Sequence, residues 1–127
     1  MADAQFLIGW GWIPLYKETG DERFLSGSQL LLDATERLLG EFDIIPMDYI
    51  ETEGKWKNYT INEAGFGPEG IAALYEVTKD ERTCEIGELY MSRLLPKFQR
   101  ADGLWERKYN FDTKTASPTR HHTRGQG

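Results

Sequence analysis

The sequence is poor in cysteine and histidine, and it opens without a long apolar run. Cys84 is the only cysteine, so no internal disulfide can form and no compartment is implied. The two histidines are the adjacent His121 and His122, which make a poor metal site without a further His or Cys cluster, so we expect no metal. No secretory or transmembrane run opens the chain, so we expect no membrane partner.

The charge balance argues against a nucleic-acid-binding protein. A net charge of −6 over 127 residues is the wrong sign for a nucleic-acid surface, which has to be basic. A hydrophobic content of 39% with 28% charged residues is typical of a soluble globular protein, here of one domain at most. The 4 Trp, 6 Tyr and 6 Phe residues indicate either a core or a sugar-stacking surface.

One segment of the chain occurs twice, at a fixed offset of 59 residues, first at 14–25 and again at 73–84. The shared positions are Leu15, Tyr16, Thr19, Asp21, Glu22 and Arg23, which match Leu74, Tyr75, Thr78, Asp80, Glu81 and Arg82. At the same offset Gly11 matches Gly70, and Asp3 matches Asn62. A fixed internal offset indicates a repeated supersecondary unit, here a helix, a tight polar turn and a second helix.

Apolar periodicity predicts four helices, over residues 4–18, 22–39, 62–77 and 81–95. The first is apolar nearly all round, as a buried helix is, and Pro14 is expected to kink it or break its hydrogen-bond ladder. We expect Gly20 to stop that helix in the left-handed conformation and Asp21 to cap the next, with Asp80 as the equivalent cap. Gly40 and Pro96 are expected to end the second and fourth helices.

Two helical hairpins joined by a long connection predict an all-α fold that forms part of an α/α toroid. The first and third helices would line its inside, and residues 41–60 would form a connection on one rim. The starts of the inner helices would then lie together, which places Asp3 near Asn62 and Glu63, beside the polar tail at residues 120–126. A short strand is predicted within residues 104–109.

Three ordered stretches carry a resemblance to known enzymes. The first is Asp3-Ala4-Gln5-Phe6 followed by Tyr16-Lys17-Glu18-Thr19-Gly20-Asp21; the second is Ile61-Asn62-Glu63 with Pro68; the third is His122-Thr123-Arg124-Gly125-Gln126-Gly127. The first stretch is similar to the enzymes' His-Asp-x-Gly-Phe followed by Tyr-x-x-Thr-Gly-Asp. The second is similar to their Ile-Asp with a Pro six residues after the Asp, and the third to their Trp-x-Arg-Gly-Gln/Asn-x-Trp. Asp102-Gly103-Leu104-Trp105 resembles a further substrate-contacting stretch. The chain thus resembles the unsaturated glucuronyl and rhamnogalacturonyl hydrolases, glycoside hydrolase families 88 and 105.

The resemblance implies that residues 1–127 form a partial (α/α)6-barrel domain, about one third of the barrel. It implies a cofactor-free hydrolase that hydrates the 4,5-unsaturated uronic acid at the non-reducing end of lyase-generated oligosaccharides. Asp3 matches the family's first active-site aspartate, whereas Asn62 stands where the family has its general acid/base. Because an amide cannot donate and recover a proton, we expect turnover to be poor, with Glu63 as the neighbouring carboxylate that points about 100° away on a helix.

The expected partner is an oligosaccharide that carries an acidic sugar. Arg124 suits the sugar carboxylate because a guanidinium pairs with it in a fork, and His122 and Gln126 belong to the same motif. Trp56 and Trp105 are predicted either to stack on sugar rings or to anchor loops on the domain surface.

Two alternative functions stay open at this point. One is a non-catalytic α/α-repeat domain that binds glycan or protein. The other is a sugar epimerase of the same architecture, which the absence of histidine from the four predicted helices disfavours. The sequence is compatible with either the cytoplasm or the periplasm. It does not predict an oligomeric state. In one third of a toroid, the faces that would meet further hairpins are expected to be exposed and apolar.

Overall fold

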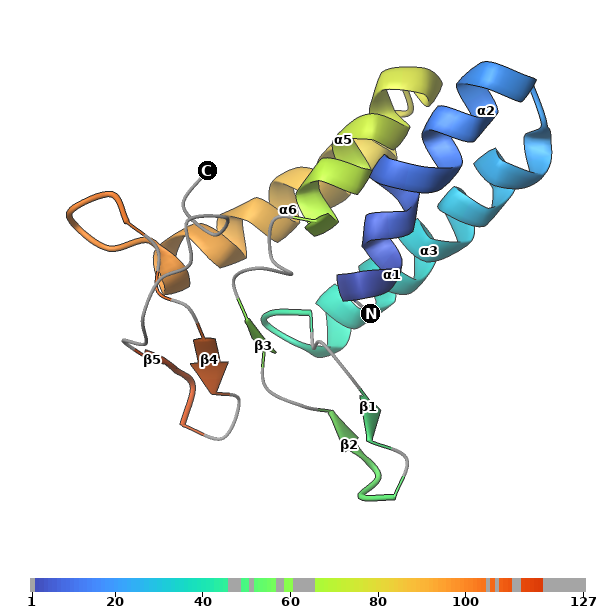
Figure 1. Cartoon of the computed structure of the whole chain (residues 1–127). Helices are drawn as coiled ribbons and strands as arrows, with labels where there is room; N and C mark the ends of the chain where they lie inside the picture. Colours follow the sequence, from blue (N-terminus) through green and yellow to red (C-terminus); the bar gives the residue numbers. More distant parts are fainter. Residues whose placement is uncertain are drawn as a thin grey trace.

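The computed structural model describes residues 2–45, 49–50, 52–56, 59–60, 66–104, 106, 108–110 and 113–117. For residues 2–4, 49–50, 55–56, 59–60, 66, 108 and 117 this description covers the backbone alone. The chain is mostly helical, as expected, and its helices form two hairpins (Figure 1).

The first hairpin begins with one uninterrupted helical run that changes its hydrogen-bond pattern on the way. It consists of α1 (Ala2–Leu7), the π-helix η1 (Ile8–Trp12) and α2 (Ile13–Thr19), and α3 (Glu22–Glu41) follows. The second hairpin consists of α5 (Phe66–Thr78) and α6 (Glu81–Phe98). The predicted start of the third helix, residues 62–65, lies outside the described residues.

Short strands occupy parts of the connections, where the sequence predicted only one. In the described residues, β1 (Tyr49–Ile50) pairs antiparallel with β2 (Lys55–Trp56). A second antiparallel sheet has the order β3-β4-β5, from β3 (Tyr59–Thr60), β4 (Lys108–Asn110) and β5 (Thr115–Ser117). The strand expected within residues 104–109 therefore exists, displaced toward its C-terminal end.

The turns of the two hairpins are built alike, which confirms the repeat. Gly20 and Lys79 both have a left-handed backbone, with φ of 68° and 54°, and each amide donates to the carbonyl oxygen four residues earlier at 2.8 Å. The hydroxyls of Thr19 and Thr78 likewise donate to the carbonyl four residues before them, at 2.7 and 3.0 Å. The pattern of the turn is thus repeated bond for bond at the offset of 59 residues.

The two capping aspartates differ. The Asp21 carboxylate accepts a hydrogen bond from the backbone N–H of Arg23 at 3.0 Å, as predicted for an N-cap. The Asp80 carboxylate accepts no backbone N–H; it accepts the Thr83 hydroxyl at 2.9 Å instead. Asp80 is thus the N-cap residue of α6, as predicted, but its carboxylate makes no side-chain cap bond like that of Asp21.

Three expected helix breakers lie inside helical structure. Pro14 lies inside the continuous helical run, and the hydrogen-bond ladder widens to the π pattern just before it, with the Ile13 N–H donating to the Ile8 carbonyl. Gly40 keeps a helical backbone, and α3 ends one residue later. Pro96 lies in the last turn of α6, which continues to the fully buried Phe98. The predicted ends at Gly40 and Pro96 were therefore wrong; at the end of α6, burial of Phe98 extends the helix past Pro96.

The hairpins lie side by side in two layers. The run α1–η1–α2 contacts α5 in one layer, and α3 contacts α6 in the other (Figure 1). The first helices are parallel and in register, because Lys17 contacts Glu76 across an offset of 59 residues. Gly70 permits this approach, since a Cβ there would lie 2.7 Å from the Gln5 backbone oxygen.

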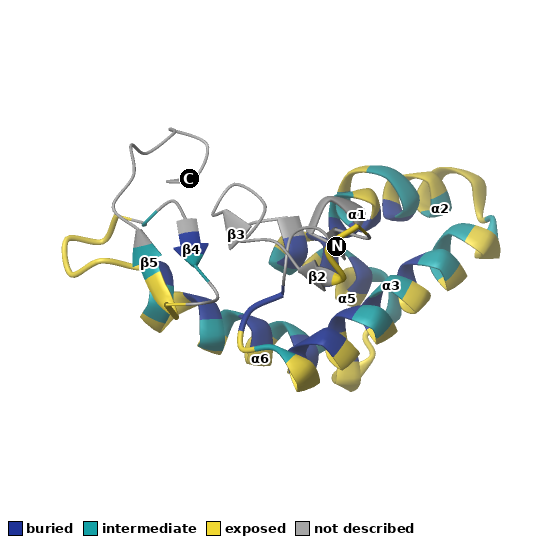
Figure 2. Ribbon diagram, turned by 90° about the horizontal axis from the view of Figure 1, so that it is seen from below, coloured by how far each residue is buried: buried dark blue, intermediate teal, exposed yellow. Residues whose placement is uncertain are grey.

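The core fills the space between the two layers, where Figure 2 shows the buried residues on the facing sides of the helices. Its fully buried side chains are Gln5, Ile8, Ile13, Leu32, Leu39, Ile44, Ile45, Leu74, Tyr90, Leu94 and Phe98. Gln5 is the polar exception, and its amide nitrogen donates to the Thr35 hydroxyl at 2.6 Å.

Candidate functional site

The structure leaves most of the predicted site residues untested. Asp3 lies in the first turn of α1 and Trp56 in β2, where the backbone alone is described. The remaining predicted residues, Asn62, Glu63, Trp105, His122, Arg124 and Gln126, lie outside the described residues.

An aromatic pair that the sequence analysis did not single out lies on the first helix, one turn from Asp3. The rings of Phe6 and Trp10 are stacked, with centroids 5.1 Å apart and planes inclined by 26°. Trp10 is 63% exposed, which is a large exposure for a tryptophan in a domain with an apolar core. The exposed indole is therefore available to a ligand.

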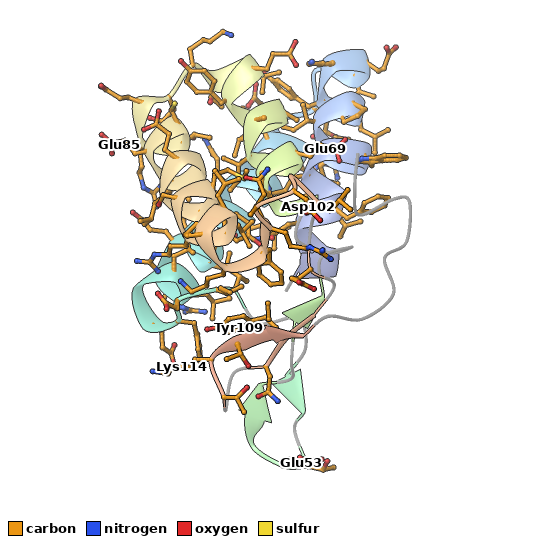
Figure 3. The ribbon with its side chains drawn as sticks, turned by 90° about the vertical axis from the view of Figure 1, so that its left-hand side faces the viewer. Glu53, Glu69, Glu85, Asp102, Tyr109 and Lys114 are labelled. Carbon is orange, nitrogen blue, oxygen red and sulfur yellow. The ribbon has the colours of Figure 1, made fainter. Side chains whose placement is uncertain are left out.

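The neighbouring first helix contributes a carboxylate to this pair. The indole Nε1 of Trp10 donates to Oε1 of Glu69 at 2.8 Å, and Figure 3 shows Glu69 on α5 beside the first helical run. We call Phe6, Trp10 and Glu69 the aromatic–carboxylate cluster. Its hydrogen bond fixes the indole plane, so the aromatic face is oriented before any ligand binds.

The cluster exists because two glycines let the helix backbones approach. Phe6 and Trp10 are four residues apart and therefore share one face of the helix. A Cβ on Gly9 would lie 3.4 Å from the Gly70 Cα atom, so the backbones are close next to Trp10 and Glu69. One sequence signal could have predicted the cluster. Trp10 and Glu69 are 59 residues apart, the repeat offset, and each lies next to one of the two glycines.

The chemistry of the cluster fits an uncharged sugar ring. An exposed aromatic side chain offers a large apolar surface and has only two rotatable side-chain bonds. A few polar groups beside it fix the orientation of a ligand. The Glu69 carboxylate can accept a hydroxyl hydrogen bond, whereas its charge disfavours an anionic group next to it. A neutral sugar unit therefore suits this position better than a uronate.

The other charged contacts between the hairpins are structural. Arg82 of α6 bridges Asp33, at 2.7 Å, and Glu36 of α3, and both carboxylates raise the pKa of its guanidinium. Lys17 hydrogen-bonds the Glu76 carboxylate and lowers its pKa. The side chains of these pairs are partly exposed, and they join neighbouring helices in each layer.

The described part of the chain contains neither a cluster of metal-ligating side chains nor a membrane-spanning helix. No group of three or more His, Cys, Asp or Glu side chains gathers there as metal ligands would. None of the helices described is both long and apolar enough to span a bilayer.

Comparisons of the chain with protein family models, with curated proteins and with solved structures gave no match.

Proposed function

We propose that this chain is an oligosaccharide-binding part of an (α/α)6-barrel hydrolase of the unsaturated uronyl type. The observation that carries the proposal is the exposed Phe6–Trp10 stack held by Glu69 on the layer of first helices. In a barrel of such hairpins this layer faces the inside, where a substrate would lie. The ordered motifs that resemble the unsaturated glucuronyl and rhamnogalacturonyl hydrolases support the same reading.

The spacing along the first helix relates the cluster to the proposed catalytic position. Residues 3, 6 and 10 are separated by three and four positions, which places them on one helix face. A neutral sugar stacked on Trp10 would leave its uronate neighbour toward Asp3, with Arg124 as the proposed partner of the carboxylate. The repeat places Asn62 at the position of the second helical run that is equivalent to Asp3.

The proposed reaction hydrates the 4,5 double bond of the uronate. A carboxyl group donates a proton to C4 while a water adds at C5 and gives up its proton to a base, and the resulting hemiketal opens. Asn62 cannot perform the acid/base step, so Asp3 or Glu63 would have to carry it. We therefore expect binding of the unsaturated disaccharide with slow turnover.

Calorimetry with a lyase-generated unsaturated disaccharide tests the binding part. We expect Trp10→Ala to weaken binding about tenfold, which corresponds to the loss of about 1.4 kcal/mol of stacking. The matched control is Leu30→Ala, because Leu30 is 70% exposed but belongs to α3 in the other layer. Equal weakening by both variants, or binding that neither affects, would refute the cluster as the sugar site.

The loss of the near-ultraviolet absorbance of the conjugated double bond tests the catalytic part. Restoring the carboxyl with Asn62→Asp should raise turnover about 10²–10⁴-fold, the usual contribution of a general acid/base group. Fast turnover by the unchanged chain that Glu63→Gln abolishes would instead assign the acid/base to Glu63.

A non-catalytic glycan-binding domain is the second candidate, and the same aromatic–carboxylate cluster favours it. Disaccharide binding that Trp10→Ala weakens, together with no turnover by the unchanged chain or by Asn62→Asp, would establish this candidate.

A further inference from the structure

Two carboxylates of α5 contact the first helical run, and their partners differ in charge. Glu76 Oε2 lies 2.8 Å from the Lys17 ammonium, so a positive charge matches its negative one. Glu69 Oε1 accepts from the neutral indole of Trp10, also at 2.8 Å. Among the described residues, no cationic side chain forms an ion pair with Glu69. The aromatic–carboxylate cluster therefore presents a carboxylate whose charge is not paired.

A ligand can reach the charge of Glu69. The residue is exposed and lies in the first turn of α5. The N-terminus of a helix offers a nearby carboxylate only a partial positive charge, which solvent screens. The carboxylates of Asp33 and Glu36, at the other contact between the hairpins, share the full charge of the Arg82 guanidinium. The cluster thus differs from that contact in keeping a negative charge for a ligand.

The hydrogen bond also fixes where this charge lies relative to the ring. A donor N–H points toward its acceptor, and the indole N–H bond lies in the ring plane, so the Glu69 carboxylate lies at the edge of the Trp10 ring. A sugar stacked on the exposed face of Trp10 would reach the carboxylate with one of its ring substituents. A positive substituent there is attracted by the carboxylate and by the aromatic face, whereas a negative one is repelled by both.

We propose that Glu69 is a specificity-determining residue, which selects the sugar on Trp10 by the charge of this substituent. The preferred unit is an amino sugar with a free ammonium group, a neutral unit binds less tightly, and a unit with an anionic substituent binds least tightly. This inference rests on the proposed function and specifies the sugar that occupies the aromatic–carboxylate cluster.

Calorimetry with three lyase-generated unsaturated disaccharides tests the order. All three contain the unsaturated uronate and a hexosamine, and they differ only in the hexosamine nitrogen, which is a free amine, acetylated or sulfated. At about pH 6 the free amine is protonated. We expect the dissociation constant to rise about threefold from the free amine to the acetylated form, and about threefold again to the sulfated form. High salt should bring the three values closer together, because exposed charges are screened.

Glu69→Gln and Glu76→Gln form a matched pair of variants. Each removes one negative charge from α5, and a glutamine at position 69 can still accept the indole N–H. Position 76 is seven residues farther along the helix, about 10 Å away, which is comparable with the screening length at physiological salt. In the unchanged chain and in Glu76→Gln, the sulfated form should have a dissociation constant about tenfold above that of the free amine. In Glu69→Gln the two constants should be nearly equal.

The outcomes separate this inference from the proposed function. Equal affinities for the three disaccharides, or an order that Glu69→Gln leaves in place, would overturn the role of Glu69 and leave the proposed sugar site standing. The same loss of the order in Glu76→Gln would overturn it as well, because the net charge of the chain would then be the cause. Absence of binding by all three disaccharides would overturn the proposed function together with this inference.

Discussion

Arg23 and Arg82 occupy the same position in the two hairpins and bind different partners. Arg23 folds back onto Asp21 of its own turn, whereas Arg82 bridges Asp33 and Glu36 of the neighbouring α3. The Thr-x-Asp-Glu-Arg turn is shared, but the next residue is Phe24 in one hairpin and Thr83, which binds Asp80, in the other. The carboxylates of α3 beside Arg82 are the second difference. The comparison shows that the ion pair formed by the repeated arginine depends on which acidic groups lie next to it.

The equivalent glycines Gly11 and Gly70 also have different neighbours, and substituting them should give the largest change in the free energy of unfolding. Gly70→Ala should lower the free energy of unfolding by about 1–3 kcal/mol, because the new Cβ would lie 2.7 Å from the Gln5 backbone oxygen. Gly11→Ala should raise it by about 0.5–1 kcal/mol, because it removes backbone freedom in the unfolded chain and meets no atom. Urea unfolding at a dilution that keeps the chain monomeric measures both. Similar effects at the two positions would show that the hairpins are not packed as described.

A buried polar pair in the first hairpin gives the next effect. The Gln5 amide donates to Thr35, and within the described part of the chain its Oε1 has no partner; the equivalent of Thr35 in the second hairpin is Leu94. Thr35→Val should destabilise by about 1–3 kcal/mol, since it leaves the amide nitrogen buried and unpaired. Adding Gln5→Leu should recover most of this loss. A double-mutant cycle in urea measures the coupling, and additive losses would contradict the buried hydrogen bond.

Gly20 and Lys79 occupy the same position in the two turns. Exchanging them should change the stability less, and with opposite sign in the two hairpins. Lys79 adopts a left-handed backbone at a cost that glycine avoids, although its ammonium lies 5.4 Å from the Tyr75 ring centroid and recovers part of it. Lys79→Gly should therefore stabilise by about 0.5–1 kcal/mol, and Gly20→Lys should destabilise by about 1 kcal/mol. Thermal unfolding compares the two, and changes of equal sign would show that the turns are not equivalent.

Acid should have the smallest effect, and it acts on the turn of the first hairpin. Hydrogen bonds from the side chain and backbone of Arg23 lower the Asp21 pKa from 3.8 to about 2. Because the folded-state pKa is depressed, this contribution to stability is complete above pH 4 and is lost as the pH falls through about 2. Carboxyl chemical shifts should place the Asp21 midpoint near 2, and Arg23→Gln should raise it. An Asp21 midpoint that Arg23→Gln leaves unchanged would contradict the ion pair.

The repeat and its turns were predictable because their interactions are local. The Thr19 and Thr78 hydroxyls and the left-handed residues bond to groups within four positions, so the sequence pattern contains both partners. The aromatic–carboxylate cluster was not predicted, because Trp10 and Glu69 meet only when two helices 59 residues apart lie in register. Of the predicted site, Asp3 and Trp56 have a described backbone, and the rest stays a prediction.

Where the hairpins turn, which helix faces are apolar and that the unit is repeated could all be predicted from the amino-acid sequence, because helix periodicity and turn chemistry depend on residues close together along the chain. The tertiary structure decided how far the last helix extends, since burial of Phe98 offsets the local cost of Pro96. It also decided which partner each repeated arginine takes. These outcomes depend on which helix lies alongside, and that is fixed by packing across the chain.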